Sequence, residues 1–128
     1  ASTLDYQRIT RSQQDIREIQ MAKSAIRAGI ESLIERSGIS RQRVHQVFLA
    51  GGFGYYLDPQ KAAVIGLLPA DLAERTTAVG NTSLKGAIGL LTGAVTLEEL
   101  QAIAAGVEEI VLGNDEAFQR LYIDYLNF

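Results

Sequence analysis

The sequence contains no cysteine and a single histidine, His45, among its 128 residues. The lack of cysteine excludes a disulfide framework, a thiolate zinc site and a Cys-ligated iron–sulfur cluster within this segment. One histidine and scattered carboxylates are a poor basis for a metal site, so we predict none here. No apolar run approaches the roughly 20 residues that cross a bilayer, and no signal peptide opens the sequence. We therefore expect a cytoplasmic protein.

Charge of one sign is not in excess either. The chain has 12 Lys and Arg against 15 Asp and Glu, a net charge of −3, so we expect neither nucleic acid nor an anionic membrane as a partner. The one dense basic stretch, residues 36–43, follows a predicted helix end. We interpret it as a solvated group of cations that complements the helix dipole, in preference to a phosphate-binding patch.

The composition, with 47% hydrophobic and 21% charged residues, is that of a globular domain. After an irregular lead-in, residues 1–11, a long helix is predicted to start at a capping box formed by Ser12 and Asp15 and to stop at Gly38. Apolar residues at helical spacing predict one buried stripe: Ile16, Ile19, Ala22, Ile26, Ile30 and Leu33. A neighbouring polar face, interpreted as solvated, contains Gln20, Lys23, Ser24 and Arg27.

Short strands and helices alternate along the rest of the chain. Strands are predicted at 46–50, 76–79 and 109–112, and helices at 60–65, 83–91, 97–105 and 115–126. This order predicts an α/β fold with a short, partly parallel sheet packed by helices. Two or three short strands make a thin sheet, since the mean sheet has about five or six. We therefore predict that neighbouring strands belong to chain on the N-terminal side, outside these residues.

A glycine-rich turn follows the first strand, in the segment Phe48-Leu49-Ala50-Gly51-Gly52-Phe53-Gly54. Glycine permits positive φ and lets a ligand approach the backbone, and a turn after a strand lies at the carboxyl edge of the sheet, where α/β proteins bind ligands. The spacing is neither G-x-G-x-x-G nor G-x-x-x-x-G-K-[ST], so a dinucleotide fold or a P-loop is disfavoured. Ligand contact and a plain tight turn both remain open.

A second segment of interest runs from Val79 to Gly89 and includes Gly80 and Asn81. Gly86 and Gly89 lie inside the predicted helix, where each costs roughly 0.5–1 kcal/mol relative to alanine. They call for a packing reason, either a closely approaching helix or a ligand across a cleft. No nucleophile with a nearby base stands out, so we predict no catalytic residue in this chain.

Taken together, these segments resemble the C-terminal domain of one protein family, the reductive activators of corrinoid proteins. The resemblance lies in D-I-R-E-I-Q-x-A-K from Asp15, in L-A-G-G-F-G-x-Y-L-D-P from Leu49, and in residues 65–69, 79–81, 86–87 and 118–128. It implies that residues 1–128 are a C-terminal subdomain, half of an actin/sugar-kinase-like (ribonuclease H-like, ASKHA-type) ATPase domain. Its parent would use ATP to return Co(II) corrinoid proteins to Co(I).

The resemblance also implies site residues. Gly51 and Gly52 match the motif that contacts the nucleotide's ribose and phosphate, and Gly86 and Ala87 match the helix at the interdomain hinge. The complete nucleotide-binding set predicted here is Gly51, Gly52, Phe53, Gly54, Gly80 and Asn81, with Gln20, Lys23 and Arg27 on the adenine side.

The implied cofactors are ATP with magnesium, in a site completed by upstream chain, and an iron–sulfur cluster in the parent only. The implied partners are a corrinoid protein, a ferredoxin-like electron donor in the parent and a second copy in a homodimer. The upstream phosphate motifs with their aspartates are absent here, so the fragment alone is not expected to hydrolyse ATP. Two alternatives stay open: a docking or dimerisation module that uses the aromatic tail (Phe118, Tyr122, Tyr125, Phe128), and part of an acetate-kinase-like small-molecule kinase.

Overall fold

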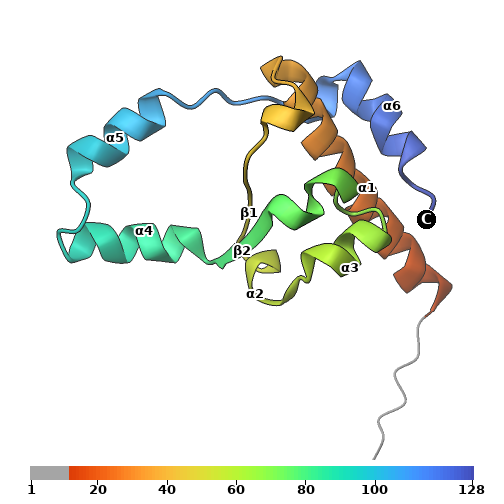
Figure 1. Ribbon diagram of the computed structural model, residues 1–128, viewed down its shortest axis with the longest axis horizontal. Coiled ribbons are helices and arrows are strands. Elements are labelled where there is room, and N and C mark those ends of the chain that lie inside the picture. The colour runs from red at the N-terminus through yellow and green to blue at the C-terminus, as the bar shows by residue number, and fades with distance from the viewer. Residues whose placement is uncertain (1–11) are drawn as a thin grey trace, which may run out of the picture.

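The computed structural model describes residues 12–128, and the predicted lead-in, residues 1–11, lies outside them. A long helix, α1, crosses the molecule beside a two-stranded sheet, and two helices reach away from this body (Figure 1). The elements in order are α1 (Gln13–Ser37), the 3-10 turn η1 (Arg41–Arg43), β1 (Val47–Ala50), α2 (Phe53–Tyr56), α3 (Pro59–Val64), the 3-10 turn η2 (Ala70–Arg75), β2 (Thr76–Gly80), α4 (Thr82–Leu91), α5 (Leu97–Ala105), the 3-10 turn η3 (Leu112–Asn114) and α6 (Glu116–Asp124).

Local capping chemistry sets most helix boundaries, as the sequence predicted. Ser12 and Asp15 form the capping box of α1, and Gly38, with φ of 63°, ends that helix in the left-handed conformation. Asp58 accepts hydrogen bonds from the first turn of α3, where Pro59 occupies a position that has no hydrogen-bonded N–H to lose. Thr96 opens α5 with a second predicted capping box.

The described residues contain one sheet, the parallel pair β1 and β2, and the fold is a helix-rich α/β arrangement. The predicted third strand, residues 109–112, is wrong. That segment is irregular as far as residue 111 and then enters η3. A strand needs a hydrogen-bonding neighbour. This stretch instead crosses from α5 back to the body, with Val107 and Val111 exposed (Figure 1).

The apolar core is small and lies between α1, α3 and η2. Ala62, Leu67 and Leu68 form its centre, with half-buried Ile26 and Ile30 of α1 packed against it. Leu49 of β1 joins the same cluster, whereas its neighbour Phe48 points the other way and is 66% exposed. One face of the sheet is therefore covered and the other is bare, which agrees with the predicted thin sheet.

The buried line on α1 differs from the predicted apolar stripe. Ile16, Ile19 and Leu33 are exposed, and the buried residues are Lys23, Ser24, Ala28 and Ser32. The reason is α6, which packs along α1 and needs small side chains spaced by one turn for close approach. Ser24 Oγ donates a hydrogen bond to the carbonyl of Tyr122 at this contact. The interpretation of the polar face as solvated is therefore wrong for Lys23 and Ser24.

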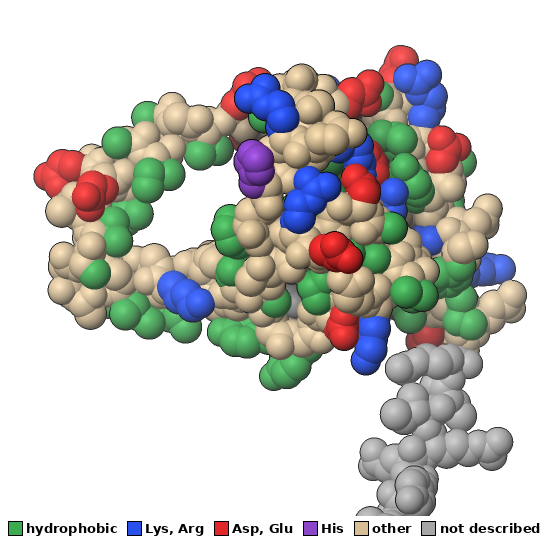
Figure 2. All heavy atoms as spheres, viewed as in Figure 1, with side chains coloured by type: hydrophobic (Ala, Val, Ile, Leu, Met, Phe, Trp, Pro, Cys, Tyr) green, Lys and Arg blue, Asp and Glu red, His purple; other side chains and the backbone are tan. Residues whose placement is uncertain are grey.

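The helices α4 and α5 form an arm that contributes no buried residue. Figure 2 shows this arm as a loop around an opening, connected to the body at both ends. Its apolar side chains are open to solvent, Leu91 by 86% and Ile103 by 66%. Some of these hydrophobic side chains border the opening itself (Figure 2).

Candidate functional site

The two glycine segments singled out in the sequence meet at the carboxyl ends of β1 and β2. The amide of Gly51 donates to the carbonyl of Gly80 at 2.9 Å, so the two turns lie side by side. Both residues have positive φ, 74° at Gly51 and 73° at Gly80, which side chains other than glycine adopt only with strain. Parallel strands bring their carboxyl ends to one edge, and this edge is the usual ligand position in α/β folds.

Gly54 has a purely internal reason to be glycine. A Cβ atom there would lie 2.5 Å from the carbonyl oxygen of Leu49 and 2.7 Å from the backbone nitrogen of Gly80. The start of α2 is thus pressed against the backbone of both strands. On the other side of this corner, a Cβ on Gly80 would lie 3.4 Å from the ring of Tyr55. Gly54 and Gly80 therefore shape the turn from within.

Gly52 is different, because the described residues give it no internal reason to be glycine. Its φ is not positive, it is exposed, and an added Cβ would have nothing within 4 Å among the described residues. Its backbone therefore faces open space beside the strand ends. A bare backbone of this kind can admit a ligand that a side chain would exclude. Phe53, the next predicted site residue, begins α2.

Asn81 and Lys85 complete the described surroundings of the turn. Asn81 caps α4, since its Oδ1 accepts from the amide of Leu84 at 2.9 Å. Lys85 was not among the site residues predicted from the sequence. Its Nζ donates to the carbonyl of Val79 at 2.8 Å, which brings an exposed cation beside the turn. A lysine near the start of a helix opposes the helix dipole, and this misfit is the signal that could have identified it.

The residues of α1 that were predicted on the adenine side make their contacts away from the glycine turns. Lys23 is only 3% exposed, and its Nζ donates to the carbonyl of Asn127 and lies 4.6 Å from the centre of the Phe128 ring. Burial lowers the pKa of Lys23, and the nearby charge of Arg27 lowers it further. Half-buried Gln20 precedes Lys23 by one turn of the same helix.

Arg27 is likewise used for packing. It pairs with Glu31 at 2.9 Å, donates to the carbonyl of Leu68 at 3.1 Å and lies 4.7 Å from the ring centre of Tyr125. These contacts, like those of Lys23, attach the C-terminal tail and the loop after α3 to α1. The structure thus brings residues 51–54 together with Gly80 and Asn81, and it does not add the α1 residues to that group.

The two glycines inside α4 also differ in their surroundings. A Cβ on Gly89 would lie 3.2 Å from Val95 in the turn after the helix, so its packing reason is local and is not the approaching helix that was predicted. Gly86 has nothing within 4 Å of an added Cβ among the described residues. The hinge role of Gly86 and Ala87 stays a prediction.

The chemistry of the turn fits a phosphate-bearing ligand better than a metal ion. Residues 51–54 and 80–81 offer backbone groups and one amide, but no carboxylate of the kind that Mg²⁺ prefers. In the part of the chain that the structure describes, no group of three His, Cys, Asp or Glu side chains could hold a metal ion. Within the same residues, none of the helices combines the length and the apolar character that crossing a membrane requires.

Comparison with known proteins gives a consistent result. Residues 1–128 match the family described as the C-terminal domain of RACo, the ASKHA domain. The corrinoid activation enzyme RamQ of Eubacterium limosum is 33% identical over 112 residues, which is 88% of this chain and 19% of that protein. The [Co(II) methylated amine-specific corrinoid protein] reductase of Methanosarcina barkeri is 29% identical over 119 residues, 91% of this chain and 22% of that protein.

The chain thus spans about a fifth of the length of these relatives. No solved structure matches it. The family match covers the whole chain and includes both glycine segments. This chain therefore belongs to the family of C-terminal ASKHA domains typified by RACo.

Proposed function

We propose that this chain is the nucleotide-binding C-terminal part of an ATP-dependent activator that returns Co(II) corrinoid proteins to Co(I). The observation that carries the proposal is Gly52, a glycine with no internal reason to be one, at the edge where Gly51 and Gly80 meet. The names of the two relatives, a corrinoid activation enzyme and a Co(II) corrinoid protein reductase, support the corrinoid protein as partner.

The residues of the turn would divide the work of holding the nucleotide. Gly51 and Gly52 would present backbone to the ribose and phosphates, with the Gly80–Asn81 turn as the neighbouring wall and Phe53 and Gly54 completing the loop. Lys85, an exposed cation tethered to the Val79 carbonyl, would add positive charge beside the phosphates. When bound, ATP supplies the free energy that an unfavourable electron transfer to the corrinoid requires.

The missing parts of the site would come from chain outside these residues. We infer that the 128 residues are half of a ribonuclease H-like domain, and that the upstream half supplies the aspartates for magnesium. The parent would also carry an iron–sulfur cluster, receive electrons through a ferredoxin-like domain and form a homodimer. The bare sheet face at Phe48 and the exposed arm support an incomplete unit, because a domain that stands alone rarely exposes so much apolar surface.

Nucleotide binding would drive activation by shifting a conformational equilibrium. ATP can do so only if it binds the closed arrangement of two lobes more tightly than the open one. A turn that contributes only part of the site satisfies this condition, because the complete site forms when the other lobe approaches. Contact with the corrinoid protein would then be coupled to closure.

The docking-module alternative uses an aromatic tail that is only partly engaged within the chain. Arg27 lies over the ring of Tyr125 and Lys23 over that of Phe128, but Phe128 is still 67% exposed. Phe118 and Tyr122 stack on each other, with ring centres 6.2 Å apart. No observation favours a small-molecule kinase.

Replacing Gly52 with valine in the full-length protein tests the proposal. The Cβ of the new side chain meets nothing in the described chain, so folding should be preserved while the nucleotide is displaced. We expect nucleotide affinity to fall by about ten-fold or more, because ångström-scale displacement of a bound group is costly. ATP-dependent reduction of a Co(II) corrinoid protein, followed by its visible spectrum without oxygen, should be lost, while the metal content stays the same.

Gly113→Val is the matched control. This glycine also has negative φ and open space around an added Cβ, but it lies in η3, away from the strand ends. It should behave as the wild type in both assays. Unchanged nucleotide affinity in Gly52→Val would remove the turn from the nucleotide site, whatever the parent does to corrinoids.

A further inference from the structure

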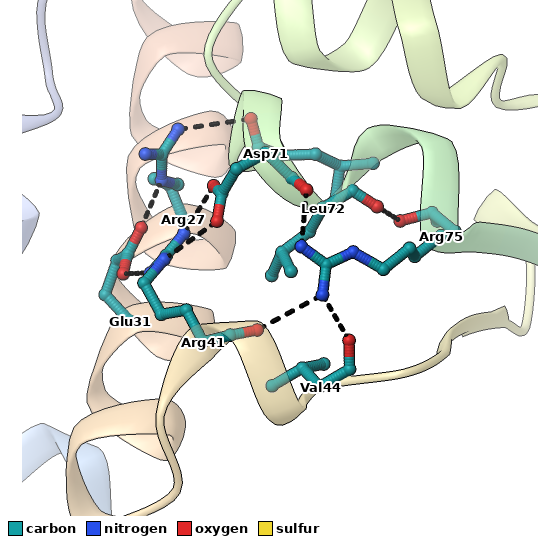
Figure 3. A network of polar contacts seen from close by, with 9 residues as sticks. Arg27, Glu31, Arg41, Val44, Asp71, Leu72 and Arg75 are labelled. Atoms are coloured by element: carbon teal, nitrogen blue, oxygen red, sulfur yellow. Dashed lines mark hydrogen bonds and ion pairs between the residues drawn. The ribbon is translucent and has the colours of Figure 1, made fainter.

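At the ends of β1 and β2 opposite the glycine turns, Arg75 joins the two strands through three backbone carbonyls (Figure 3). A further side-chain bond lies beside it, from Gln46 Nε2 to Thr77 Oγ1 at 2.7 Å. Arg75 immediately precedes β2, and its Nη1 donates to the carbonyls of Arg41 at 3.2 Å and Val44 at 2.5 Å, in the segment that leads into β1. Its Nη2 donates to the carbonyl of Asp71 at 3.1 Å. A planar guanidinium holds several acceptors at fixed angles. Arg75 therefore ties the start of one strand to the start of the other.

A second arginine, Arg41, holds this corner against α1. Its Nε and Nη2 donate to the two carboxylate oxygens of Asp71 at 3.0 and 2.7 Å, and its Nη1 donates to Glu31 of α1. Hydrogen bonding between Arg41 and Asp71 raises the pKa of Arg41 and lowers the pKa of Asp71. Figure 3 shows the two guanidinium groups on either side of the Asp71 segment. The residues whose carbonyls accept from Arg75 thus include Arg41 and Asp71, which are themselves held to α1.

The sheet that starts at this corner is short and has one irregularity. β1 has four residues and β2 has five, and the pairing begins at Val47 and Thr76 and skips Val79. Near the glycine turns the register shifts, so that Ala50 pairs with Gly80, and this shift accompanies the bond from the Gly51 amide to Gly80. A slip of one residue would turn side chains to the opposite face and break that bond. With so few ladder bonds, the register needs support from outside the sheet.

We propose that Arg75, held in place by Arg41, is a positioning residue of the nucleotide site. It sets the register of the strands at one end of the sheet and so aligns the two glycine turns at the other. The strand between them spans roughly 16 Å at the usual rise per residue, so Arg75 acts without touching the ligand. The identity of the ligand rests on the function proposed above, whereas the alignment of the turns does not.

The test uses Arg75→Met and Arg75→Lys in the full-length protein, with Arg43→Gln as the matched control. Arg43 lies in η1 beside the same corner, but its exposed side chain makes no hydrogen bond or ion pair with the described residues. Two measurements are made on each variant: hydrogen–deuterium exchange of peptides that cover Gly51, and ADP affinity by calorimetry well below the melting temperature. The exchange measurement reports the alignment without any ligand.

We expect faster exchange at Gly51 in Arg75→Met, and an ADP affinity lower by about ten-fold, the scale on which a displaced binding group acts. Arg75→Lys should restore part of both, since it keeps the charge and loses the fork, and it carries the test if Arg75→Met does not fold. Arg43→Gln should match the wild type. A purely structural role would lower stability and leave the affinity of the folded protein unchanged.

Unchanged exchange at Gly51 in both Arg75 variants would overturn the proposal, and so would unchanged ADP affinity in a wild type that binds. The remaining outcome separates the two inferences. If no form binds ADP, the wild type included, while Arg75→Met still exchanges faster at Gly51, the strand alignment by Arg75 is supported and the nucleotide function is overturned.

Discussion

The body of the molecule and its arm are both rich in apolar residues, but only the body buries them. Leu68 and Leu72 in the body are each 1% exposed, whereas no residue of α4 or α5 in the arm is buried. The arm nevertheless has well-formed helices, with Asn81 and Thr96 as caps. The difference shows that local capping signals can specify a helix of which the described chain buries no residue.

The first prediction tests this difference with two leucine truncations. Leu72→Ala in the body should lower the free energy of unfolding by about 3 kcal/mol, because it removes buried methyl groups and leaves a cavity. Leu91→Ala in the arm should change it by less than about 0.5 kcal/mol, since the 86% exposed side chain has little contact to lose. Urea unfolding followed by circular dichroism measures both.

A large cost for Leu91→Ala in the isolated chain would contradict the exposed arm and indicate that it packs onto the body in solution. Repeating the pair in the full-length protein sharpens the comparison. There the cost of Leu91→Ala should rise if upstream chain covers α4, while the cost of Leu72→Ala should stay near its value in the isolated chain.

Much of the fold was predictable from the sequence because its signals are local. Ser12, Gly38 and Asp58 mark helix ends through hydrogen bonds to their own neighbours, and the structure has each of them in that role. The predicted stripe on α1 is confirmed at Ile26 and Ile30, which pack against the core. It is wrong at Ile16 and Leu33, because periodicity alone does not say where along the helix a face meets a neighbour within the chain. The strand at 109–112 was wrong because an apolar run needs a partner strand that the described chain does not provide there.

The second prediction compares a glycine of the body with one of the arm. Gly54→Ala should destabilise the protein by about 2 kcal/mol, since the added Cβ would lie 2.5 Å from a carbonyl oxygen and force the backbone apart. Gly86→Ala should stabilise it by about 0.5 kcal/mol or slightly more, because alanine is the better helix former and the added atom meets open space.

Thermal melting of the two variants checks both signs. A destabilising Gly86→Ala would mean that another segment approaches the arm closely at that position, as the predicted hinge role requires in the full-length protein. A neutral Gly54→Ala would mean that α2 sits less tightly against the strand ends than the structure shows.

The candidate site was predictable only as a group of glycines. The sequence marks Gly51, Gly52 and Gly54 alike, but their reasons differ: left-handed backbone at the first, open space at the second and close packing at the third. Those reasons depend on the neighbouring strand β2, whose Gly80 lies 26 to 29 residues further along the sequence. The α1 residues Lys23 and Arg27 share a face with Gln20, but whether that face meets the turn or the C-terminal tail is likewise a matter of tertiary packing.

The smallest expected effect concerns charge, and it again separates body from arm. The hydrogen bonds from Arg41 lower the pKa of Asp71 in the folded protein, so the pair stabilises the fold above the unfolded pKa of about 4, and the contribution is lost as pH falls through the lower folded value. The Asp71 side chain is 49% exposed, so solvent screening limits the contribution to less than about 1 kcal/mol.

Asp71→Asn should remove that part of the acid sensitivity. Glu98→Gln in the arm should not, because the Glu98 side chain has no hydrogen bond or ion pair within the described residues. Urea midpoints at neutral and acid pH distinguish the two, and equal acid limbs for wild type and Asp71→Asn would show that the Arg41 pairing contributes nothing measurable to the stability of the body.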